Sequence, residues 1–296
     1  MIVAHPVIDL RARPGTAAVP DAHDPLEESQ LLYGEQVKVV EIHDGWAHIE
    51  ALEQAEYSHG RRWQGYPGWI AADALVSAAE AWEPTIVLVE PWVRLWKDAY
   101  HTDPLPLRLP MGTVLRGTEV GPGWRAELID GTRAWINRDQ AASLRQCQAM
   151  SAPQRRQAVL RAAERLLGVP YYWGGRSPHA PLQGQVTGVD CSGLVNLAYR
   201  TIGMAIPRDS HEQHLRAKPV LSPQPADLIF LSAPEEPQRI THVMLYAGSD
   251  AVIEGPGTGH TVRRITLSQR LGRSLSELQP GTTVNNQTVY FGAYLE

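Results

Sequence analysis

The residue of this chain best suited to nucleophilic chemistry is a cysteine that begins a predicted helix. Cys191 lies in the run Asp190-Cys191-Ser192-Gly193, followed by apolar residues at helical spacing. Unsatisfied N–H groups and the positive end of the helix dipole favour a thiolate there, and the thiolate is the nucleophilic form. A lone cysteine near a helix start is more often a buried structural thiol, so its position alone does not decide between the two interpretations.

A nucleophilic thiol needs a base, and His242 is the candidate. It lies at the start of a predicted strand over 241–246. An imidazole can take the thiol proton and later return it to the leaving amine. The chain has 11 histidines, so a histidine at a strand start also fits an ordinary surface residue.

Glu254 is the candidate for the third member of a catalytic triad, and its position depends on strand register. If residues 248–250 form a three-residue hairpin loop, Ala247 faces Ala251, and Glu254 lies diagonal to His242 on one face. A carboxylate there can accept the imidazole N–H, fix its tautomer and stabilise its charged form. A two-residue loop would place Glu254 on the opposite face.

Two helices followed by a set of strands predict an α+β domain that positions these three residues. The first helix is predicted over 154–167, after Ser151-Ala152-Pro153 and before Gly168, and the second over 191–202. The strands are predicted over 227–231, 241–246, 251–254 and 288–294.

The first half of the chain contains a weak internal repeat that predicts two small antiparallel barrels. Each copy has short runs in which apolar and polar residues alternate, and glycines separate the runs. This order resembles the bacterial SH3-type barrel. Four tryptophans of the repeats are expected in the barrel cores: Trp46, Trp69, Trp124 and Trp135. The runs of the first copy are 7–11, 34–39, 45–49 and 68–70, and those of the second are 93–96, 112–115, 123–126 and 134–136.

The first copy carries an extra segment, Glu50 to Tyr66, which the second lacks. Insertions in a compact barrel often form functional loops. A tolerated surface insertion is the alternative interpretation.

Ordered motifs in the second half resemble the NlpC family of papain-like bacterial cell-wall cysteine peptidases. The resemblance implies hydrolysis of the γ-D-glutamyl to diamino-acid (diaminopimelate or lysine) bond of peptidoglycan peptides, with Cys191 as nucleophile and His242 as base. The third residue of that family, commonly a histidine, falls at Glu254. The motifs are 170–175 (PYYWGG), 188–195 (GVDCSGLV), 206–210 (IPRDS) and 241–243 (THV).

The resemblance also predicts the organisation of the whole chain. The fold class is α+β: SH3-like barrels at 1–80 and 81–149 precede a papain-like cysteine peptidase domain at 150–296. Two barrels before such a domain are similar to a subgroup that recognises peptides with a free N-terminal L-alanine, in which the first barrel walls the cleft. Because a buried ammonium needs anionic or polar partners, the candidates here are Asp209, Ser210 and Tyr66, with Glu28 or Glu35 of the first barrel as a further carboxylate.

Other residues of the motifs have two interpretations each. Tyr171 either lines the pocket or donates to the oxyanion, together with the backbone N–H of Cys191. Asp190 and Ser192 either contact polar groups of the substrate or, for Asp190, cap the helix. Arg208 pairs either with a substrate carboxylate or with a local acid.

Composition limits the expected partners. The net charge of −5 gives no electrostatic footprint for nucleic acid or membrane, and peptidoglycan-derived peptides are the expected partners of a monomeric chain. No cofactor or metal is expected, because His211 and His214 lie three residues apart without an evident third ligand. The chain as written reads as cytoplasmic, or as periplasmic or secreted if a signal peptide was removed.

Two other functions fit parts of the sequence. A cell-wall binding protein whose catalytic domain has decayed would explain the unusual Glu254. An acyltransferase or amidase could use the same thiol scaffold but would form a new amide or ester bond.

Overall fold

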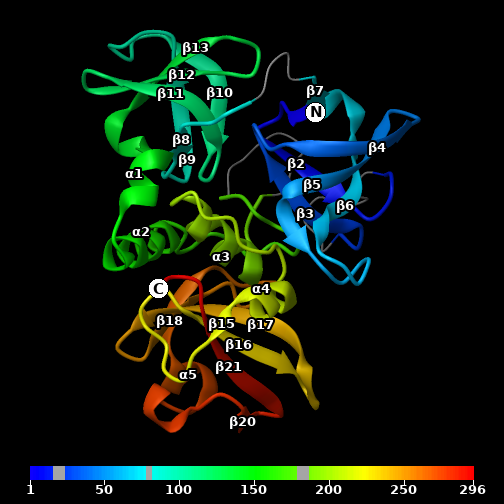
Figure 1. Cartoon of the computed structure of the whole chain (residues 1–296), viewed down its shortest axis with the longest axis vertical. Coiled ribbons are helices and arrows are strands. Elements are labelled where there is room, and N and C mark those ends of the chain that lie inside the picture. The colour runs from blue at the N-terminus through cyan, green and yellow to red at the C-terminus, as the bar shows by residue number, and fades with distance from the viewer. Residues whose placement is uncertain (16–23, 78–81, 179–186) are drawn as a thin grey trace.

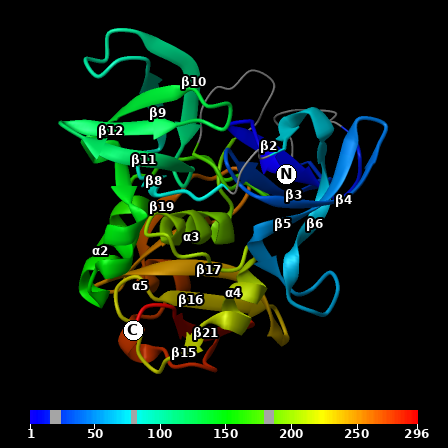
Figure 2. The same ribbon diagram turned by 45° about the horizontal axis from the view of Figure 1, so that its top comes forward.

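The computed structural model describes residues 1–15, 24–77, 82–178 and 187–296. Three sheets dominate this part of the chain, one of five strands and two of seven. Figure 1 shows the two N-terminal sheets beside each other and the C-terminal sheet below, with helices between them. Figure 2 shows α3 and α4 next to β17 of the C-terminal sheet. This is the α+β architecture that the sequence predicts.

The first barrel is the five-stranded sheet, in the order β3-β2-β6-β5-β4. Alternating side chains of these strands form its core, which includes Leu10, Leu31, Ile49 and Ile70, all without exposed surface. A two-stranded sheet of β1 (Ile2–Val3) and β7 (Leu75–Val76) accompanies it. The strands are β2 (Val7–Arg11), β3 (Glu27–Leu32), β4 (Val37–His43), β5 (Trp46–Glu56) and β6 (Gln64–Ala71), followed by the 3₁₀ turn η1 (Ala72–Ala74).

The second barrel is a seven-stranded sheet, in the order β10-β9-β13-β12-β11-β8-β14. Of the four repeat tryptophans expected in barrel cores, only Trp124 is buried, while Trp46, Trp69 and Trp135 are half-buried. That prediction was wrong for three of them because aliphatic side chains such as Ile70 and Ile136 fill the interiors. The elements are β8 (Ile86–Leu88), β9 (Trp92–Trp96), β10 (Pro104–Pro110), β11 (Val114–Val120), β12 (Gly123–Glu127), β13 (Arg133–Asn137), η2 (Arg138–Gln140) and β14 (Ala141–Ser143).

Both predicted helices are present in the C-terminal part. Helix α2 starts earlier than predicted, because Ser151 and Gln154 form a capping box and Pro153 lies in its first turn. Helix α3 begins at Cys191 and is buried throughout. The helices are α1 (Leu144–Ala149), α2 (Ala152–Glu164), α3 (Cys191–Arg200), α4 (Ser210–Arg216), α5 (Leu267–Leu271) and the 3₁₀ turn η3 (Leu275–Glu277).

The C-terminal sheet has the order β15-β21-β16-β17-β18-β19, with β20 paired to β21. One apolar cluster contains Phe230 and Val243 together with residues of α2 and α3, and the other contains Ile229 and Met244 together with residues of α5. The sheet is therefore buried on both faces. Its strands are β15 (Lys218–Pro219), β16 (Leu228–Ala233), β17 (Glu236–Gly248), β18 (Ala251–Glu254), β19 (Arg263–Thr266), β20 (Thr283–Val284) and β21 (Gln287–Ala293).

The loop of the β17–β18 hairpin is shorter than predicted, but Glu254 still lies beside His242. Gly248 pairs with Ala251, so the loop has two residues instead of three. A register shift between Tyr246 and Gly248 then adds one residue to β17, and Leu245 faces Ile253. Because the bulge compensates for the shorter loop, the strands keep the register that brings Glu254 to His242.

The predicted domain boundaries stay predictions. The boundary between residues 80 and 81 lies outside the described residues, which omit 78–81. Among the helices of the described part, none is both long enough and apolar enough to cross a membrane.

Candidate active site

Cys191 occupies the first turn of α3, and Asp190 caps that helix. The Asp190 carboxylate accepts hydrogen bonds from the backbone N–H of Gly193 (2.6 Å) and of Gly174 (3.1 Å). The helix-cap interpretation of Asp190 is therefore confirmed. Cys191 is 8% exposed and lies at the N-terminal end of the helix, where backbone N–H groups have no intrahelical partners.

His242 lies between Cys191 and Glu254. Its Nε2 is 2.8 Å from Oε2 of Glu254, which leaves Nδ1 for the thiol. Burial opposes the charged imidazolium, but hydrogen bonds to Cys191 and Glu254, together with their charges, raise the pKa of His242 to about 9. The site thus favours a protonated imidazole beside the sulfur.

Glu254 is a fully buried carboxylate held in its charged form by three cationic side chains. Burial alone would raise its pKa, but His242, Arg263 and Arg270 together lower it to about 2. Arg263 Nη2 lies 2.7 Å from Oε1, and Arg270 Nε lies 3.0 Å from Oε2. Glutamate in place of the histidine common in the resembling family is thus compensated by two arginines on β19 and α5.

Arg208 lies beneath the site and contacts no solvent. Its guanidinium forms a bidentate pair with Asp190, at 3.1 and 2.9 Å, and donates to Ser192 Oγ (3.0 Å) and Ser29 Oγ (2.8 Å). Of the two partners predicted for Arg208, the structure shows the local acid. Arg208 is not among the residues that line the cavity beside Cys191, and its buried guanidinium joins β3 of the first barrel to the start of α3.

A cavity of about 370 Å³ opens beside Cys191. Seven of the eight predicted substrate-binding residues line it: Tyr171, Asp190, Ser192, Asp209, Ser210, Tyr66 and Glu28. Glu35 is buried elsewhere in an ion pair with Arg176 (2.6 Å). Besides Cys191, the rest of the lining consists of residues to which the sequence assigned no substrate contact: Ser58, His59, Trp173, His211, Glu212 and the segment 239–241.

Two carboxylates face one hydroxyl at the end of the cavity formed with the first barrel. The hydroxyl of Tyr66 lies 3.0 Å from Asp209 and 3.3 Å from Glu28. Because a phenol carries one proton, it can donate fully to only one of them. Burial, only partly offset by Arg208, raises the pKa of Asp209 to about 7. Arg208 Nη1 lies 3.7 Å from Oδ1 of Asp209, but Arg208 is already paired with Asp190, so this end of the cavity is rich in carboxylates.

The inserted segment of the first barrel reaches this cavity as an extension of the β5–β6 hairpin. Glu212 of α4 accepts from the backbone N–H of Ser58 (3.2 Å) and from its hydroxyl. The backbone N–H of Arg208 donates to the carbonyl of Ala55 (3.1 Å). Because these bonds attach the hairpin to the C-terminal part, the functional interpretation of the insertion is favoured over that of a free surface loop.

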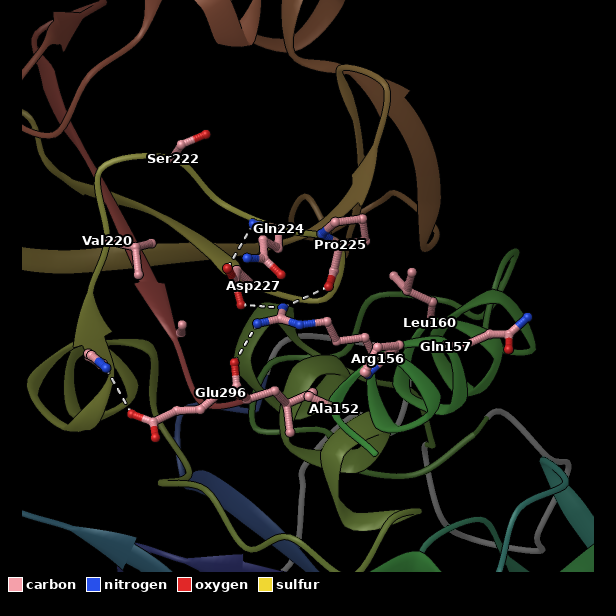
Figure 3. A pocket seen from close by; sticks show the side chains of 14 residues that line it. Ala152, Arg156, Gln157, Leu160, Val220, Ser222, Gln224, Pro225, Asp227 and Glu296 are labelled. Atoms are coloured by element: carbon pink, nitrogen blue, oxygen red, sulfur yellow. Dashed lines mark hydrogen bonds and ion pairs between the residues drawn. The ribbon is translucent and has the colours of Figure 1, made fainter. Parts of the chain in front are cut away.

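A larger cavity, of about 610 Å³, lies away from Cys191 between α2 and the end of β21. Figure 3 shows Arg156 extending along it toward Asp227 and the carbonyl of Pro225. Arg156 also donates to the carbonyl of Leu295, so its guanidinium is occupied by the fold. Among the described residues, no cysteine and no histidine lines this cavity, and no group of three His, Cys, Asp or Glu side chains is placed to hold a metal ion.

Comparison with known proteins identifies one domain. The model of the NlpC/P60 family matches residues 168–277. These residues form an NlpC/P60 domain, and the chain is a cysteine peptidase.

Similarity to some known proteins also covers the barrel region of the chain. The chain is 27% identical over 257 residues to a γ-D-glutamyl-L-lysine dipeptidyl-peptidase of Bacillus cereus, with 81% of this chain and 71% of the relative covered. It is 26% identical over 252 residues to the protein of that name in Bacillus subtilis, with 84% and 78% covered. An NlpC/P60 family structure from Bacillus cereus shares the fold over 100% of this chain and 99% of its own, with a TM-score of 0.77 and 24% identity.

Proposed function

We propose that this NlpC/P60 peptidase hydrolyses the γ-D-glutamyl to diamino-acid bond of short peptidoglycan peptides that carry a free N-terminal L-alanine. The observation that carries the proposal is the pairing of a thiol–imidazole–carboxylate row with an acidic cavity end built partly by the first barrel. The relatives that match both barrels and the peptidase domain are named γ-D-glutamyl-L-lysine dipeptidyl-peptidases, which supports this substrate class.

The proposed reaction uses Cys191 as nucleophile and His242 as proton carrier. The Cys191 proton moves to His242, and the thiolate attacks the γ-carbonyl carbon of D-glutamate. The backbone N–H of Cys191 and the Tyr171 hydroxyl stabilise the oxyanion. The imidazolium then protonates the leaving amine of the diamino acid, and water, deprotonated by His242, hydrolyses the thioester. Glu254 fixes the imidazole tautomer and stabilises its charge throughout.

Selection for the free N-terminus follows from the acidic end of the cavity. An ammonium group brings three N–H donors and a positive charge to a place where Tyr66 satisfies only one of two carboxylates. An N-acetylated terminus brings neither the charge nor the donors, and leaving Asp209 and Glu28 desolvated would cost binding energy. Ser210 Oγ, at the start of α4, lines the same cavity and is proposed as a further partner.

The predicted organisation is part of this proposal. Residues 1–80 would form the barrel that walls the cleft, 81–149 the second barrel, and 150–296 the peptidase domain. The first barrel limits the cleft to short peptides, which favours fragments released from the wall over the intact polymer. A monomeric chain and the compartment stay predictions.

Exchange of Cys191 for alanine tests the nucleophile. We expect the variant to lose release of the diamino acid from L-Ala-γ-D-Glu-diamino acid entirely, while circular dichroism and thermal unfolding stay those of the wild type. Iodoacetamide should modify the wild-type protein at Cys191, and prior modification should stop the reaction. Undiminished product from the Cys191→Ala variant would rule out the proposed mechanism.

The same assay separates the alternatives. Supplying an acceptor amine and analysing the products by mass spectrometry would reveal amide formation by an acyltransferase. A wild-type protein that cleaves no peptide and leaves Cys191 unmodified at neutral pH would instead indicate a binding protein.

A further inference from the structure

The cavity beside Cys191 has a basic side as well as its acidic end. Of the described residues that line it, Arg239 is the only arginine or lysine. Its side chain is 65% exposed, and its one ion pair, with Glu236, is 3.5 Å long and equally exposed. An exposed pair of this kind is weak, so the guanidinium is free to bind another anion.

An irregularity in β17 places Arg239 in the cavity wall. His242 pairs with Leu231 and Ile240 pairs with Ser232, so Thr241 is an extra residue in the ladder. In a regular strand only alternate side chains would share one wall, but a bulge breaks that alternation. Here three consecutive residues, 239–241, line the cavity directly before His242.

A second cavity, of about 710 Å³, adjoins the first at Arg239. The two share Ser58, His211, Arg239 and Ile240 in their walls. His211 is positioned by its Nδ1, which accepts from the backbone N–H of Ile240 at 3.4 Å. The space around Arg239 is therefore large enough for a group that extends beyond the scissile bond.

The acids of the cavity do not neutralise Arg239. Asp190 is paired with Arg208, and Glu212 is bonded to Ser58. Glu28 and Asp209 both lie within hydrogen-bond distance of the Tyr66 hydroxyl. The cavity thus has an anionic end suited to an ammonium and a cationic side suited to a carboxylate.

We propose that Arg239 is a specificity-determining residue that binds a carboxylate of the substrate, at the junction of the two cavities. This inference rests on the proposed function and deepens it. Besides the C-terminal carboxylate that every such tripeptide carries, two carboxylates have the required chemistry and differ between substrates: the α-carboxylate of the D-glutamyl residue, and the second carboxylate of a diaminopimelate, which lysine lacks. A guanidinium matches either one bidentately.

The experiment uses four peptides and three variants of the full chain. The peptides are L-Ala-γ-D-Glu followed by lysine or diaminopimelate, and the same two with the D-glutamyl α-carboxylate converted to an amide. Arg239→Ala removes the charge and Arg239→Lys keeps it. Arg264→Ala is the matched control, because Arg264 is another exposed arginine of this domain in a 3.0 Å pair with Glu164.

We expect Arg239→Ala to lower kcat/KM roughly 10- to 100-fold on the peptides that carry the recognised carboxylate, mostly through KM. Arg239→Lys should recover part of this loss and Arg264→Ala should show none. A loss confined to the non-amidated peptides assigns the α-carboxylate of D-glutamate. A loss confined to the diaminopimelate peptides assigns the second carboxylate.

A loss of equal size on all four peptides, or none on any, would overturn the proposal. If the wild-type enzyme cleaves the peptides and the Arg239→Ala variant has the same kcat/KM, the inference about Arg239 is overturned but the proposed function is not. A wild-type enzyme that cleaves none of the four peptides overturns the proposed function, and this inference with it.

Discussion

The two barrels arise from one sequence repeat but relate differently to the active site. In the first, the β5–β6 hairpin has strands of eleven and eight residues, whereas the matching β12 and β13 of the second have five each. The first barrel contributes Glu28, Ser58, His59 and Tyr66 to the cavity beside Cys191, and among the described residues the second contributes none. An insertion in one copy has thus given one barrel a part in the site.

The barrels also differ in how they attach to the peptidase domain. The first is joined through buried charge: Glu35 pairs with Arg176 at 2.6 Å and with Arg200 at 3.4 Å, all nearly inaccessible. The second is joined by a partly exposed pair between Glu90 and Arg165, at 2.9 Å, and by apolar packing. Buried pairs demand a fixed geometry, so the barrel that lines the cleft is also the one with the more specific attachment.

The largest expected effect comes from breaking the buried attachment. Glu35→Gln keeps the side-chain shape but leaves the guanidinium of Arg176 without its charge partner in the interior. Losing one partner of a buried pair typically costs about 3–5 kcal/mol of unfolding free energy. Urea or thermal denaturation measures this.

The matched change in the second barrel is Glu90→Gln. Since both partners of that pair are partly exposed, the expected loss is below about 1 kcal/mol. Equal destabilisation by the two variants would contradict the proposed difference in attachment.

A smaller effect is expected where the first barrel meets the substrate. Tyr66→Phe removes the hydroxyl between Asp209 and Glu28. The hydroxyl is hydrogen-bonded to the Asp209 carboxylate, which is proposed to bind the substrate ammonium. Loss of this bond should lower kcat/KM for the free-amine tripeptide roughly 10- to 100-fold. Steady-state kinetics with the tripeptide measure this.

Thr132 occupies the position in the second barrel that corresponds to Tyr66 when Trp69 and Trp135 are aligned. Thr132→Ala should leave kcat/KM within twofold of the wild type, about 0.4 kcal/mol. If Thr132→Ala reduced activity as much as Tyr66→Phe, the barrels would not differ in the way described.

The pH dependence sharpens the comparison further. Asp209 has a pKa raised to about 7 by burial, so it is neutral below that pH and anionic above it. We expect kcat/KM for a free-amine peptide to fall as the pH drops below about 7, because the ammonium loses a charged partner. Asp209→Asn should remove this limb of the profile. A limb of unchanged position and depth in that variant would exclude Asp209 as its source.

Much of the fold could be predicted because the patterns are local. Period-two alternation gave strand β2 at 7–11, and helical spacing with Pro153 gave α2 to within a few residues. The burial of the repeat tryptophans was less predictable, since it depends on whether aliphatic side chains already fill the barrel interior. That is a property of three-dimensional packing, and the sequence pattern alone does not contain it.

The active site likewise contains residues that the sequence predicted and residues that it did not. Cys191, His242 and Glu254 follow from motifs and strand parity, although the loop length was wrong and a bulge restored the register. A local acid was one of the two partners predicted for Arg208, but its bond to Ser29 could not be inferred, because Ser29 lies 179 residues away in the first barrel. Arg239 was missed because only the bulge in β17 brings it into the cavity wall.

The central claim is that the first barrel makes this enzyme selective for peptides with a free N-terminal amine. The most direct test compares cleavage of L-Ala-γ-D-Glu-diamino acid with cleavage of its N-acetylated form by the wild-type enzyme. The account predicts kcat/KM at least about 100-fold higher for the free amine, because acetylation removes the charge that Asp209 and Glu28 require. Equal rates for the two peptides would contradict it.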